Sequence, residues 1–582
     1  MRYQVNFGNL TVTSSPLKAA TGKFRIAILG DFSARANSGE LATGDALAKR
    51  KAIRVDADNL EDVFGRFQVT LRLPLAADGG TVEIPVANLD ELHPDELYGN
   101  VELFSELASL RKRLKTSSTF AAAAKEVQSW KSAVADDDDS TPRGKARGAT
   151  IPHGKLSDFA RLVGQPTSGD AGEAAVADLL KQIVGPYVVP SKDPQQDKLI
   201  AAVDQALSDA MRRVLHHPDF QTLESLWRSV DLLVRRLECD ESLQIVLIDV
   251  TAEEIAADLS QAEDLTESGL YKLLVEQPSL DASQGAFAAI LGAYVFEQTP
   301  PHCELLGRLA RIAVLAKAPF IAGVSNDCLV KRKPEEVHPL MKQAWDDLRA
   351  LPEAAYLGLV APRFLLRWPY GKKTEPITPF AFEEFTPQSG VSGMLWGNGA
   401  ILAGLLLGAT FQAQGLKAMK LGSAMSVTDM PYYFYTDKDG DQIALPCTDR
   451  LLSEALCQYV SNQGIMPLVS FKGRAEVRLA SFQSLAGKPL LGPWSSESVS
   501  VSSTAGGGGG SSTAKAEAPA TASAEAASEP AADGADAAAS ADAELDALLA
   551  SLGGGDSTPA ASDASAGDDA IDPELAALLA DL

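Results

Sequence analysis

Cysteine is scarce in this sequence, and its distribution excludes a disulfide framework. The five cysteines are odd in number, are widely spaced, and include no Cys-x-x-Cys pair. They are Cys239, Cys303, Cys328, Cys447 and Cys457. Disulfide frameworks use even numbers of cysteines, and the common zinc sites use close pairs. The pattern therefore indicates buried thiols in a reducing compartment, and we expect a cytoplasmic protein.

Long apolar segments are also missing. The longest nearly apolar run, residues 399–411, is shorter than the roughly 20 residues that a membrane-spanning helix needs. Residues 1–7 alternate between apolar and polar side chains, as a strand does, and they lack the apolar core of a signal peptide. These features predict a chain that does not insert into membranes.

Basic residues are outnumbered by acidic ones. The sequence contains 52 lysines and arginines and 77 aspartates and glutamates, which give a net charge of −25. A strongly acidic chain is not attracted to nucleic acid or to anionic lipid, so we expect neither as a partner. The charge is uneven. Residues 497–582 contain sixteen acidic residues and a single basic one, Lys515. The remainder of the chain is therefore only mildly acidic.

Catalytic motifs are absent too. The sequence contains no GxxxxGK[ST] phosphate loop, no HExxH and no GxSxG. Gly30 and Asp31 follow an apolar run, but one glycine favours a strand-ending turn over a phosphate loop. The closely spaced acids Asp437, Asp439 and Asp441 resemble a calcium loop only superficially. Such a loop needs glycine at its sixth position and glutamate at its twelfth, and here these positions hold glutamine and threonine.

Histidine offers no better candidate for a metal site. His216 and His217 are adjacent, so they cannot share one face of a helix. His302 and Cys303 are neighbours without a third ligand nearby in the sequence. We therefore predict no catalytic residue, no cofactor and no metal ion.

Residues 1–130 have the pattern of an α/β unit. The run at 24–29, which is apolar except for one arginine, ends at Gly-Asp and predicts a buried strand. Residues 67–73 and 82–86 alternate with a period of two, which predicts two further strands. Leucines at helical spacing within residues 95–130 predict a pair of helices.

Residues 196–495 are expected to form the main domain, also of mixed α/β type. Helices are predicted at 199–215 and 220–237, followed by a strand at 243–250. An apolar segment at 286–294, a helix at 304–318 and a strand at 320–324 predict a parallel crossover. Two short apolar segments flank an Asp-Gly turn within residues 431–445 and predict a hairpin. Residues 131–195 join the two parts as a linker with one helical stretch, at 173–184, and with four consecutive aspartates that favour solvation.

Composition changes sharply at the end of the chain. Residues 496–582 are rich in Ala, Ser, Gly, Asp and Glu and bury too little apolar surface to offset chain entropy, so we expect disorder. Two segments, 542–552 and 572–582, share the frame Asp-x-Glu-Leu-x-Ala-Leu-Leu-Ala-x-Leu. Their leucines form one helical stripe each: Leu545, Leu548, Leu549 and Leu552, then Leu575, Leu578, Leu579 and Leu582. These motifs are either docking peptides that become helical in a partner's groove or the result of biased composition.

Four charged residues are candidates for an ion pair in the main domain. Arg363 and Arg367 lie four apart among large apolar residues, and Glu383 and Glu384 lie in a Phe-Glu-Glu-Phe segment. Arginine is the usual partner of a buried or interfacial carboxylate. The pairing is either internal or between subunits, and the sequence leaves both open.

Several sequence blocks are similar to two protein families. The first blocks are residues 23–33 (KFRIAILGDFS), 53–56 (IRVD) and 89–95 (LDELHPD); the later ones are residues 219–228 (DFQTLESLWR), 318–322 (APFIA), 362–371 (PRFLLRWPYG), 395–398 (LWGN) and 464–469 (GIMPLV). The first set resembles the small subunit of the type VI secretion contractile sheath (the TssB or VipA family). The second set resembles the large subunit of that sheath (the TssC or VipB family).

The resemblance implies two sheath-type α/β domains joined by a linker and a mechanical function without a cofactor. It implies a fused building block that assembles with other sheath subunits around an inner tube protein, meets a baseplate, contracts, and is recycled by an unfoldase ATPase. Strand exchange links the blocks of such sheaths, and residues 1–7 would be a donated strand.

The resemblance has one departure. Large sheath subunits continue with further strands after the region matching residues 464–469, whereas here the acidic tail follows. One alternative is therefore a sheath-related adaptor or terminator that recruits a partner through its tail. Another is a cytosolic enzyme with an unrecognised site. A linker of this length also allows the two parts to pair within one chain or between chains.

Overall fold

The apolar run near the N-terminus forms strand β1 (Phe24–Gly30), and all of its residues are buried in the computed structural model. The structure describes residues 5–12, 14–17, 22–75, 81–130, 196–281, 285–330, 337–437, 440–499 and 501. The mixed α/β fold predicted from the sequence is confirmed.

The main sheet has nine strands within these described residues. Across the sheet the order is β11 (Ser426–Thr428), β15 (Glu476–Leu479), β14 (Ile465–Ser470), β8 (Leu357–Ala361), β7 (Phe320–Val324), β6 (Ala289–Phe296), β1, β5 (Leu243–Asp249) and β2 (Ile53–Val55). The six strands from β14 to β5 run parallel. Outside them, β2 pairs antiparallel with β5, β15 with β14, and β11 with β15. The predicted parallel crossover from β6 to β7 is confirmed.

Strand β1 lies in the interior of this sheet. It pairs with β5 on one side, where Ile26 is opposite Ile245, and with β6 on the other, where Ile26 is opposite Ala289. Strands from the N-terminal segment (residues 1–130) and from the C-terminal segment (residues 196–501) therefore share one sheet. The sequence left open whether the two parts pair within one chain or between chains. In the structure they pair within one chain.

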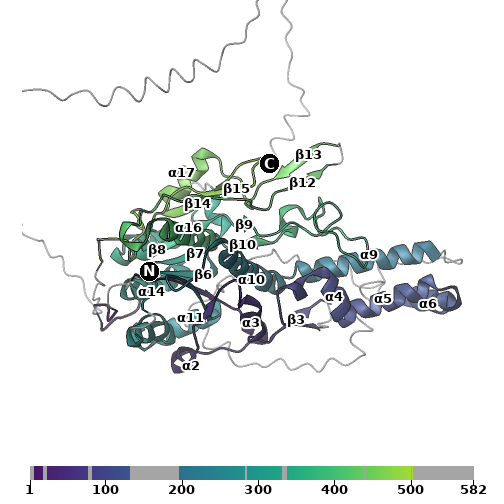
Figure 1. Cartoon of the computed structure of the whole chain (residues 1–582), viewed down its shortest axis with the longest axis horizontal. Coiled ribbons are helices and arrows are strands. Elements are labelled where there is room, and N and C mark those ends of the chain that lie inside the picture. The colour runs from purple at the N-terminus through teal and green to yellow at the C-terminus, as the bar shows by residue number, and fades with distance from the viewer. Residues whose placement is uncertain are drawn as a thin grey trace, which may run out of the picture. The chain divides into compact units, whose positions relative to one another are not determined.

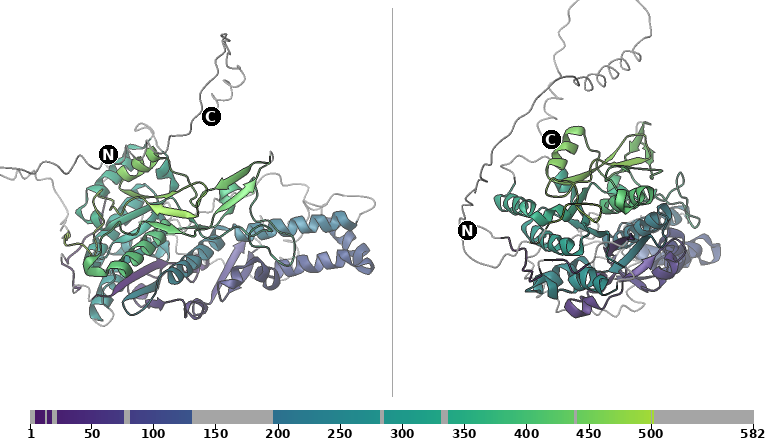
Figure 2. Two further views of the ribbon diagram at one scale, coloured as in Figure 1. Left: turned by 45° about the horizontal axis from the view of Figure 1, so that its top comes forward. Right: turned by 60° about the vertical axis from the view of Figure 1, so that its left-hand side comes forward.

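Helices cover both faces of the sheet, because the side chains of its central strands are apolar on both sides. Ile26 and Ile28 of β1 point into a cluster with helices α10 (Pro218–Arg236) and α16 (Gly399–Gln414). The alternate residues of β1 point to the opposite face, where α11 (Ala252–Gln261) and α14 (Pro300–Ala316) pack. Figure 2 shows the purple N-terminal and the teal-to-green C-terminal elements in one body.

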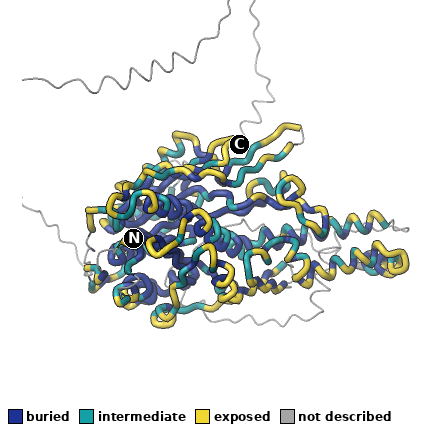
Figure 3. Tube along the Cα trace, in the orientation of Figure 1, coloured by how far each residue is buried: buried dark blue, intermediate teal, exposed yellow. Residues whose placement is uncertain are grey.

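Helix α16 explains the longest apolar run of the sequence. It is apolar all round, and twelve of its residues are buried. A helix of this kind belongs in a protein core when it is too short to span a bilayer. Its first turn is capped by Asn398, which accepts a hydrogen bond from the Ala400 amide at 3.0 Å. The tube in Figure 3 is correspondingly dark at the centre of the body, where the sheet and this helix lie.

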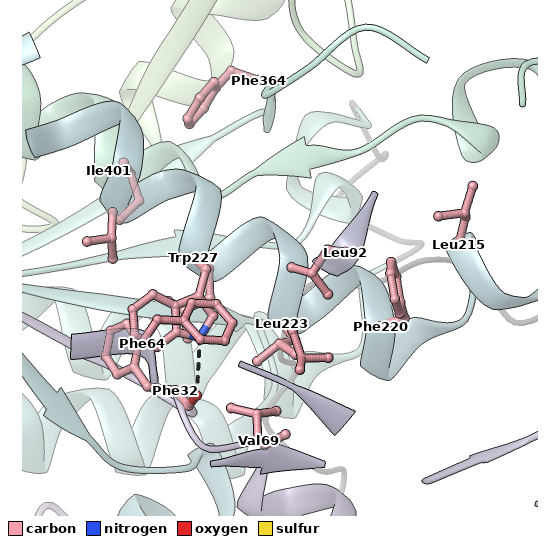
Figure 4. Packing of buried hydrophobic residues seen from close by; sticks show 14 of the residues in the cluster. Phe32, Phe64, Val69, Leu92, Leu215, Phe220, Leu223, Trp227, Phe364 and Ile401 are labelled. Atoms are coloured by element: carbon pink, nitrogen blue, oxygen red, sulfur yellow. Dashed lines mark hydrogen bonds between the residues drawn. The ribbon is translucent and has the colours of Figure 1, made fainter. Parts of the chain in front are cut away.

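Trp227 on α10 joins the two segments through aromatic packing. Its ring centroid lies 4.1 Å from that of Phe64 on α3 (Leu60–Gly65) and 5.3 Å from that of Phe32, which follows β1. Its indole Nε1 donates a hydrogen bond to the Phe32 carbonyl at 3.2 Å (Figure 4). The N-terminal segment is therefore held by side-chain packing as well as by the sheet.

Three helices extend together from the body as an arm (Figure 1). They are α5 (Glu102–Lys115), α6 (Ser117–Trp130) and α9 (Gln196–Leu215). Gln196 donates to the Leu114 carbonyl at 2.7 Å, and Arg111 forms an ion pair with Asp204. The prediction of only two helices in residues 95–130 is wrong. Single extended residues, Val101 and Thr116, break the stretch into α4 (Pro94–Asn100), α5 and α6, and neither is a glycine or proline.

Small two-stranded sheets complete the fold. They are β3 (Val69–Pro74) with β4 (Thr81–Val86), β9 (Phe364–Leu365) with β10 (Trp396–Gly397), and β12 (Tyr433–Thr436) with β13 (Gln442–Leu445). The strands expected at 67–73 and 82–86 and the hairpin expected within 431–445 are confirmed. The further helices are α1 (Arg35–Ser38), α2 (Gly44–Ala48), α12 (Gly269–Tyr271), α13 (Gln277–Leu280), α15 (Pro339–Ala350) and α17 (Glu454–Asn462). The helix expected at 173–184 lies outside the described residues.

Candidate functional site at the junction of the two segments

The carboxyl ends of β1 and β5 meet in a polar turn. Asp249, the last residue of β5, accepts hydrogen bonds from the amides of Phe32 (2.9 Å) and Ser33 (3.3 Å) and from the Ser33 hydroxyl (2.9 Å). It also forms an ion pair with Arg35. Backbone amides after a strand are the donors that a phosphate would use. Here the Asp249 carboxylate of the C-terminal segment accepts the hydrogen bonds from those amides, which agrees with a strand-ending turn.

Arg50 ties the same turn to helix α11. It forms an ion pair with Glu254, whose side chain is fully buried, and it donates to the Asp249 carbonyl at 2.6 Å. Glu254 also accepts from the Ala42 amide at 2.9 Å. With Thr251 it forms a capping box at the start of α11. Because Arg50 belongs to the N-terminal segment and Glu254 to the C-terminal one, this buried pair links them.

A small cavity lies beside this junction. Its volume is about 30 Å³, and its lining includes Asp31, Thr222, Ser225, Arg363 and Asn398. Burial raises the pKa of Asp31, although the backbone amides that bind its carboxylate act in the opposite direction. The cavity holds about one water molecule, whereas small-molecule sites measure about 300–1,000 Å³. The shifted pKa of Asp31 therefore reflects a buried structural carboxyl next to a water-sized space.

Arg367 lies between two buried carboxylates. Its Nε and Nη2 donate to Glu224 at 2.7 and 3.2 Å, and its Nη1 and Nη2 donate to Glu384 at 2.7 and 3.0 Å. The exposed fractions of the three side chains are 6% for Arg367, 0% for Glu224 and 1% for Glu384. Arg228 donates a further hydrogen bond to Glu224 at 2.7 Å, and the Tyr370 amide donates to Glu384 at 2.8 Å. We call these five residues the Arg367 network.

Electrostatics keep this network charged despite its burial. Burial alone would raise the pKa of Glu384, but Arg367 and His216 outweigh it and lower that pKa to about 2. In the same way, Arg367 and Arg228 outweigh burial and lower the pKa of Glu224. Burial alone would lower the pKa of Arg367, but the two carboxylates outweigh it and raise that pKa well above its ordinary value. A buried arginine with two bidentate carboxylates is held in one geometry.

The structure brings together two of the four residues predicted to form an ion pair, Arg367 and Glu384. Arg363 pairs instead with Asp449, with 2.8 Å between Nε and Oδ2. Glu383 accepts from the Lys372 amide at 3.1 Å through its side chain. Glu383 is exposed whereas Glu384 is buried, and only Glu384 reaches Arg367.

Sequence reasoning missed Glu224. The available signal was its place on α10, where it is buried among the apolar side chains of Phe220, Leu223 and Trp227. A glutamate on the apolar face of an amphipathic helix requires a buried partner. That signal points to an arginine but does not identify which one.

The loop between Tyr370 and Glu384 also contacts the N-terminal segment. Asp95 on α4 accepts from the amide and the hydroxyl of Thr378, both at 3.0 Å. The His93 ring meets the Tyr370 ring edge-on, with 4.8 Å between the centroids. The Arg367 network therefore lies next to a second junction between the segments.

The histidines and aspartates considered as metal ligands serve local structure. His217 accepts from the Asp219 amide and caps α10, whereas His216 Nε2 lies 3.6 Å from Glu384. In the hairpin turn, Asp437 accepts from the Asp441 amide at 2.8 Å. Across the described part of the chain, no three His, Cys, Asp or Glu side chains are grouped to hold a metal ion.

Residues 5–12 and 14–17 lie along helix α14 of the same chain. Arg308 and Arg311, both nearly buried on α14, donate to the backbone carbonyls of Asn6 and Gly8. We expected residues 1–7 to be donated to a neighbouring block. Their described part, residues 5–7, is bound within its own chain instead. Residues 1–4 of that strand lie outside the described residues.

Replacing Gly307 with alanine is expected to release residues 5–10 from α14. A Cβ atom at this position would lie 2.1 Å from Phe7 Cδ1, so the ring must leave its place. Hydrogen exchange of residues 5–12 should accelerate by about tenfold or more, while exchange in β1 stays unchanged. Gly99→Ala is the matched control, because a Cβ there meets nothing within 4 Å. Equal exchange in both variants would contradict the packing described.

Two expectations concern residues outside the described part of the chain. They are the leucine motifs at 542–552 and 572–582 and the disorder of the tail. Their docking role stays a prediction. Among the described helices, none combines the length and apolar character needed to cross a membrane.

Comparison with known proteins finds a match in each segment. The family model "EvpB/VC_A0108, tail sheath N-terminal domain" (VipB) matches residues 197–486. The model "Type VI secretion system, VipA, VC_A0107 or Hcp2" matches residues 18–141. The chain is also 31% identical over 363 residues to the type VI secretion system sheath protein TssC1 of Pseudomonas aeruginosa. That alignment covers 58% of this chain and 72% of the relative.

Both matches agree with the blocks from which the resemblance was inferred, and that inference is confirmed. The parts matched by the two models are also the parts whose strands share one sheet. The chain belongs to the sheath protein family of type VI secretion systems, as a structural component in which a TssB-like and a TssC-like part are fused.

Proposed function

We propose that residues 1–130 and 196–495 act as one complete building block of the sheath, with residues 131–195 as their connection. The observation that carries this proposal is the place of β1 between β5 and β6. A strand with neighbours on both sides cannot leave without opening the sheet. The two parts therefore move as one body when copies of the chain change their packing.

The family implies assembly with other sheath subunits. We further propose that the blocks stack around an inner tube protein on a baseplate in the cytoplasm, contract, and are recycled by an unfoldase ATPase. The junction supports a mechanical role, because its charged groups are used in links between segments and its cavity is only water-sized.

Electron microscopy of the purified chain tests this proposal. We expect long hollow tubes, formed by the chain alone or with its inner tube protein. The chain's own monomer at low concentration is the control, since assembly depends on mass action. Discrete particles, or caps on tubes made by other subunits, would contradict the building block and favour the adaptor or terminator.

A further inference from the structure

One long loop of the body contains no helix and no strand. It comprises residues 366–389, between β9 and the 3₁₀ turn at Gly390–Gly393, and the structure describes all of it. Loops of more than about 12–15 residues without secondary structure are uncommon in compact domains, and those that are well ordered usually have a function. The contacts of the 366–389 loop therefore indicate what it does.

The Arg367 network closes this loop at its base. Arg367 and Glu384, which lie 17 positions apart, are joined by hydrogen bonds of 2.7 and 3.0 Å. Glu224 on α10 binds the same guanidinium from the body, with 2.7 Å between its Oε1 and the arginine Nε. Arg228, one turn further along α10, donates to the Tyr370 hydroxyl at 2.9 Å. The loop is therefore anchored on α10 by buried polar groups.

The arm of α5, α6 and α9 joins the body through two short joints in the described chain. Val101, in an extended conformation, separates α4 from α5, and His216 and His217 separate α9 from α10. A few residues at the end of an element are sufficient to act as a hinge. Helix α9 has 20 residues and is about 30 Å long, so a pivot of about 10° at its base moves its far end by about 5 Å. The orientation of the arm therefore depends on what holds the two joints.

The 366–389 loop holds the helix that precedes the first joint. Besides the contacts of Asp95 and His93 described above, the ring of Tyr98 on α4 lies 5.5 Å from the ring of Phe380. Helix α4 ends at Asn100, directly before the joint. The loop thus contacts α4 along its length and fixes the start of α5.

The same loop holds the helix that precedes the second joint. Arg212, in the last turn of α9, donates from Nε to the Glu383 carbonyl at 2.9 Å, and its guanidinium carbon lies 5.6 Å from the centre of the Phe382 ring. His216 Nε2 lies 3.6 Å from Glu384. Helix α9 therefore ends on three consecutive residues of the loop, and one loop holds both joints of the arm.

We propose that the 366–389 loop is a brace that fixes the orientation of the arm relative to the body, with the Arg367 network as its anchor on α10. With the brace in place, a rotation of the body is passed to the far end of the arm and is not absorbed at the joints. The proposal concerns the single chain and does not depend on assembly into a sheath.

Combining Asp95→Ala with Arg212→Ala tests the brace. This brace variant removes contacts of the loop at both joints and leaves the buried Arg367 network in place. Double electron–electron resonance measures the distance between spin labels on noncanonical residues at Lys115, at the end of α5, and at Glu61 on α3 of the body, which are both exposed. Because a small pivot moves the arm by several ångströms, we expect the width of the distance distribution to increase at least about twofold.

The matched control combines Asp45→Ala with Arg235→Ala. It removes the same two residue types from ion pairs elsewhere on the body, those with Lys272 and Asp231. We expect the control to have the distance distribution of the unmodified chain. A distribution in the brace variant as narrow as that of the unmodified chain, or a control as broad as the brace variant, would overturn the brace.

Hydrogen exchange of the same proteins separates a local effect from a loss of overall stability. In the brace variant, the amides at the two joints, residues 101–105 and 216–221, should exchange at least about fivefold faster, while those of β1 stay unchanged. An equal acceleration in β1 would show that the contacts stabilise the whole fold and not the orientation of the arm, and it would also overturn the proposal.

Discussion

Residues 196–582 produced without residues 1–130 are expected to aggregate rather than fold. Removal of β1 leaves β5 and β6 without the strand that separates them. It also deletes Phe24, Ile26, Ile28 and Leu29, which are fully buried. Burying each such side chain contributes about 1.5–3 kcal/mol, and the total stability of a domain is about 5–15 kcal/mol. The loss is therefore comparable to the whole stability.

Co-production of residues 1–130 as a separate chain should restore a folded complex. A second test introduces a protease site between residues 131 and 195 of the full chain. After cleavage we expect the two fragments to elute together in size-exclusion chromatography at low concentration. Separation of the fragments, or a well-folded product from residues 196–582 alone, would contradict the interior position of β1.

Arg367→Met is expected to lower the free energy of unfolding by about 3–5 kcal/mol, because it leaves Glu224 and Glu384 buried without their shared partner. Urea denaturation at pH 8 measures the effect. The matched control is Arg235→Met, which breaks an ion pair with Asp231 on an arginine that is 72% exposed. Exposed pairs of this spacing contribute about 0.3–0.5 kcal/mol, so the control should change stability little.

The pH dependence separates lost charge pairing from lost packing. The folded-state pKa of Glu384 is about 2, below its ordinary value near 4.3. In the unmodified chain its contribution is therefore complete above about pH 4.3 and is lost only as the pH falls toward 2. Without Arg367, burial is opposed only by Arg228 at Glu224 and by His216 at Glu384, so we expect the pKa of both glutamates to rise. Protonation of these carboxyls at lower pH then reduces the destabilisation of the variant. The difference between the two proteins should shrink from pH 8 to pH 5.5, and a constant difference would contradict the electrostatic explanation.

Local sequence pattern was sufficient to predict most of the elements but not their neighbours in space. The apolar run at 24–29 predicts a strand buried on both faces, and β1 is such a strand. Nothing in that run indicates that its partners are β5 and β6, which follow more than two hundred residues later. Strand partners depend on chain topology, which periodicity does not carry.

The Arg367 network was predicted in part for a related reason. Composition singles out Arg367 as an arginine among apolar residues, and proximity in sequence suggests Glu384. Glu224 and Asp449 were missed because they reach their partners through tertiary packing, across 143 and 86 positions of the chain. The resemblance to sheath subunits carried more information about function than any of these residues.

The interior position of β1 has a consequence for the synthesis of the protein. The ribosome makes β1 early and β6 much later, and at about 5–20 residues per second β1 waits roughly 15–50 seconds for both of its neighbours. During that time a strand that is apolar except for Arg25 has unpaired edges and is prone to aggregate. Its partners nevertheless arrive on the same polypeptide in a ratio of one to one. We expect production of this protein to depend on chaperones that hold the nascent chain, and not on balanced expression of two genes.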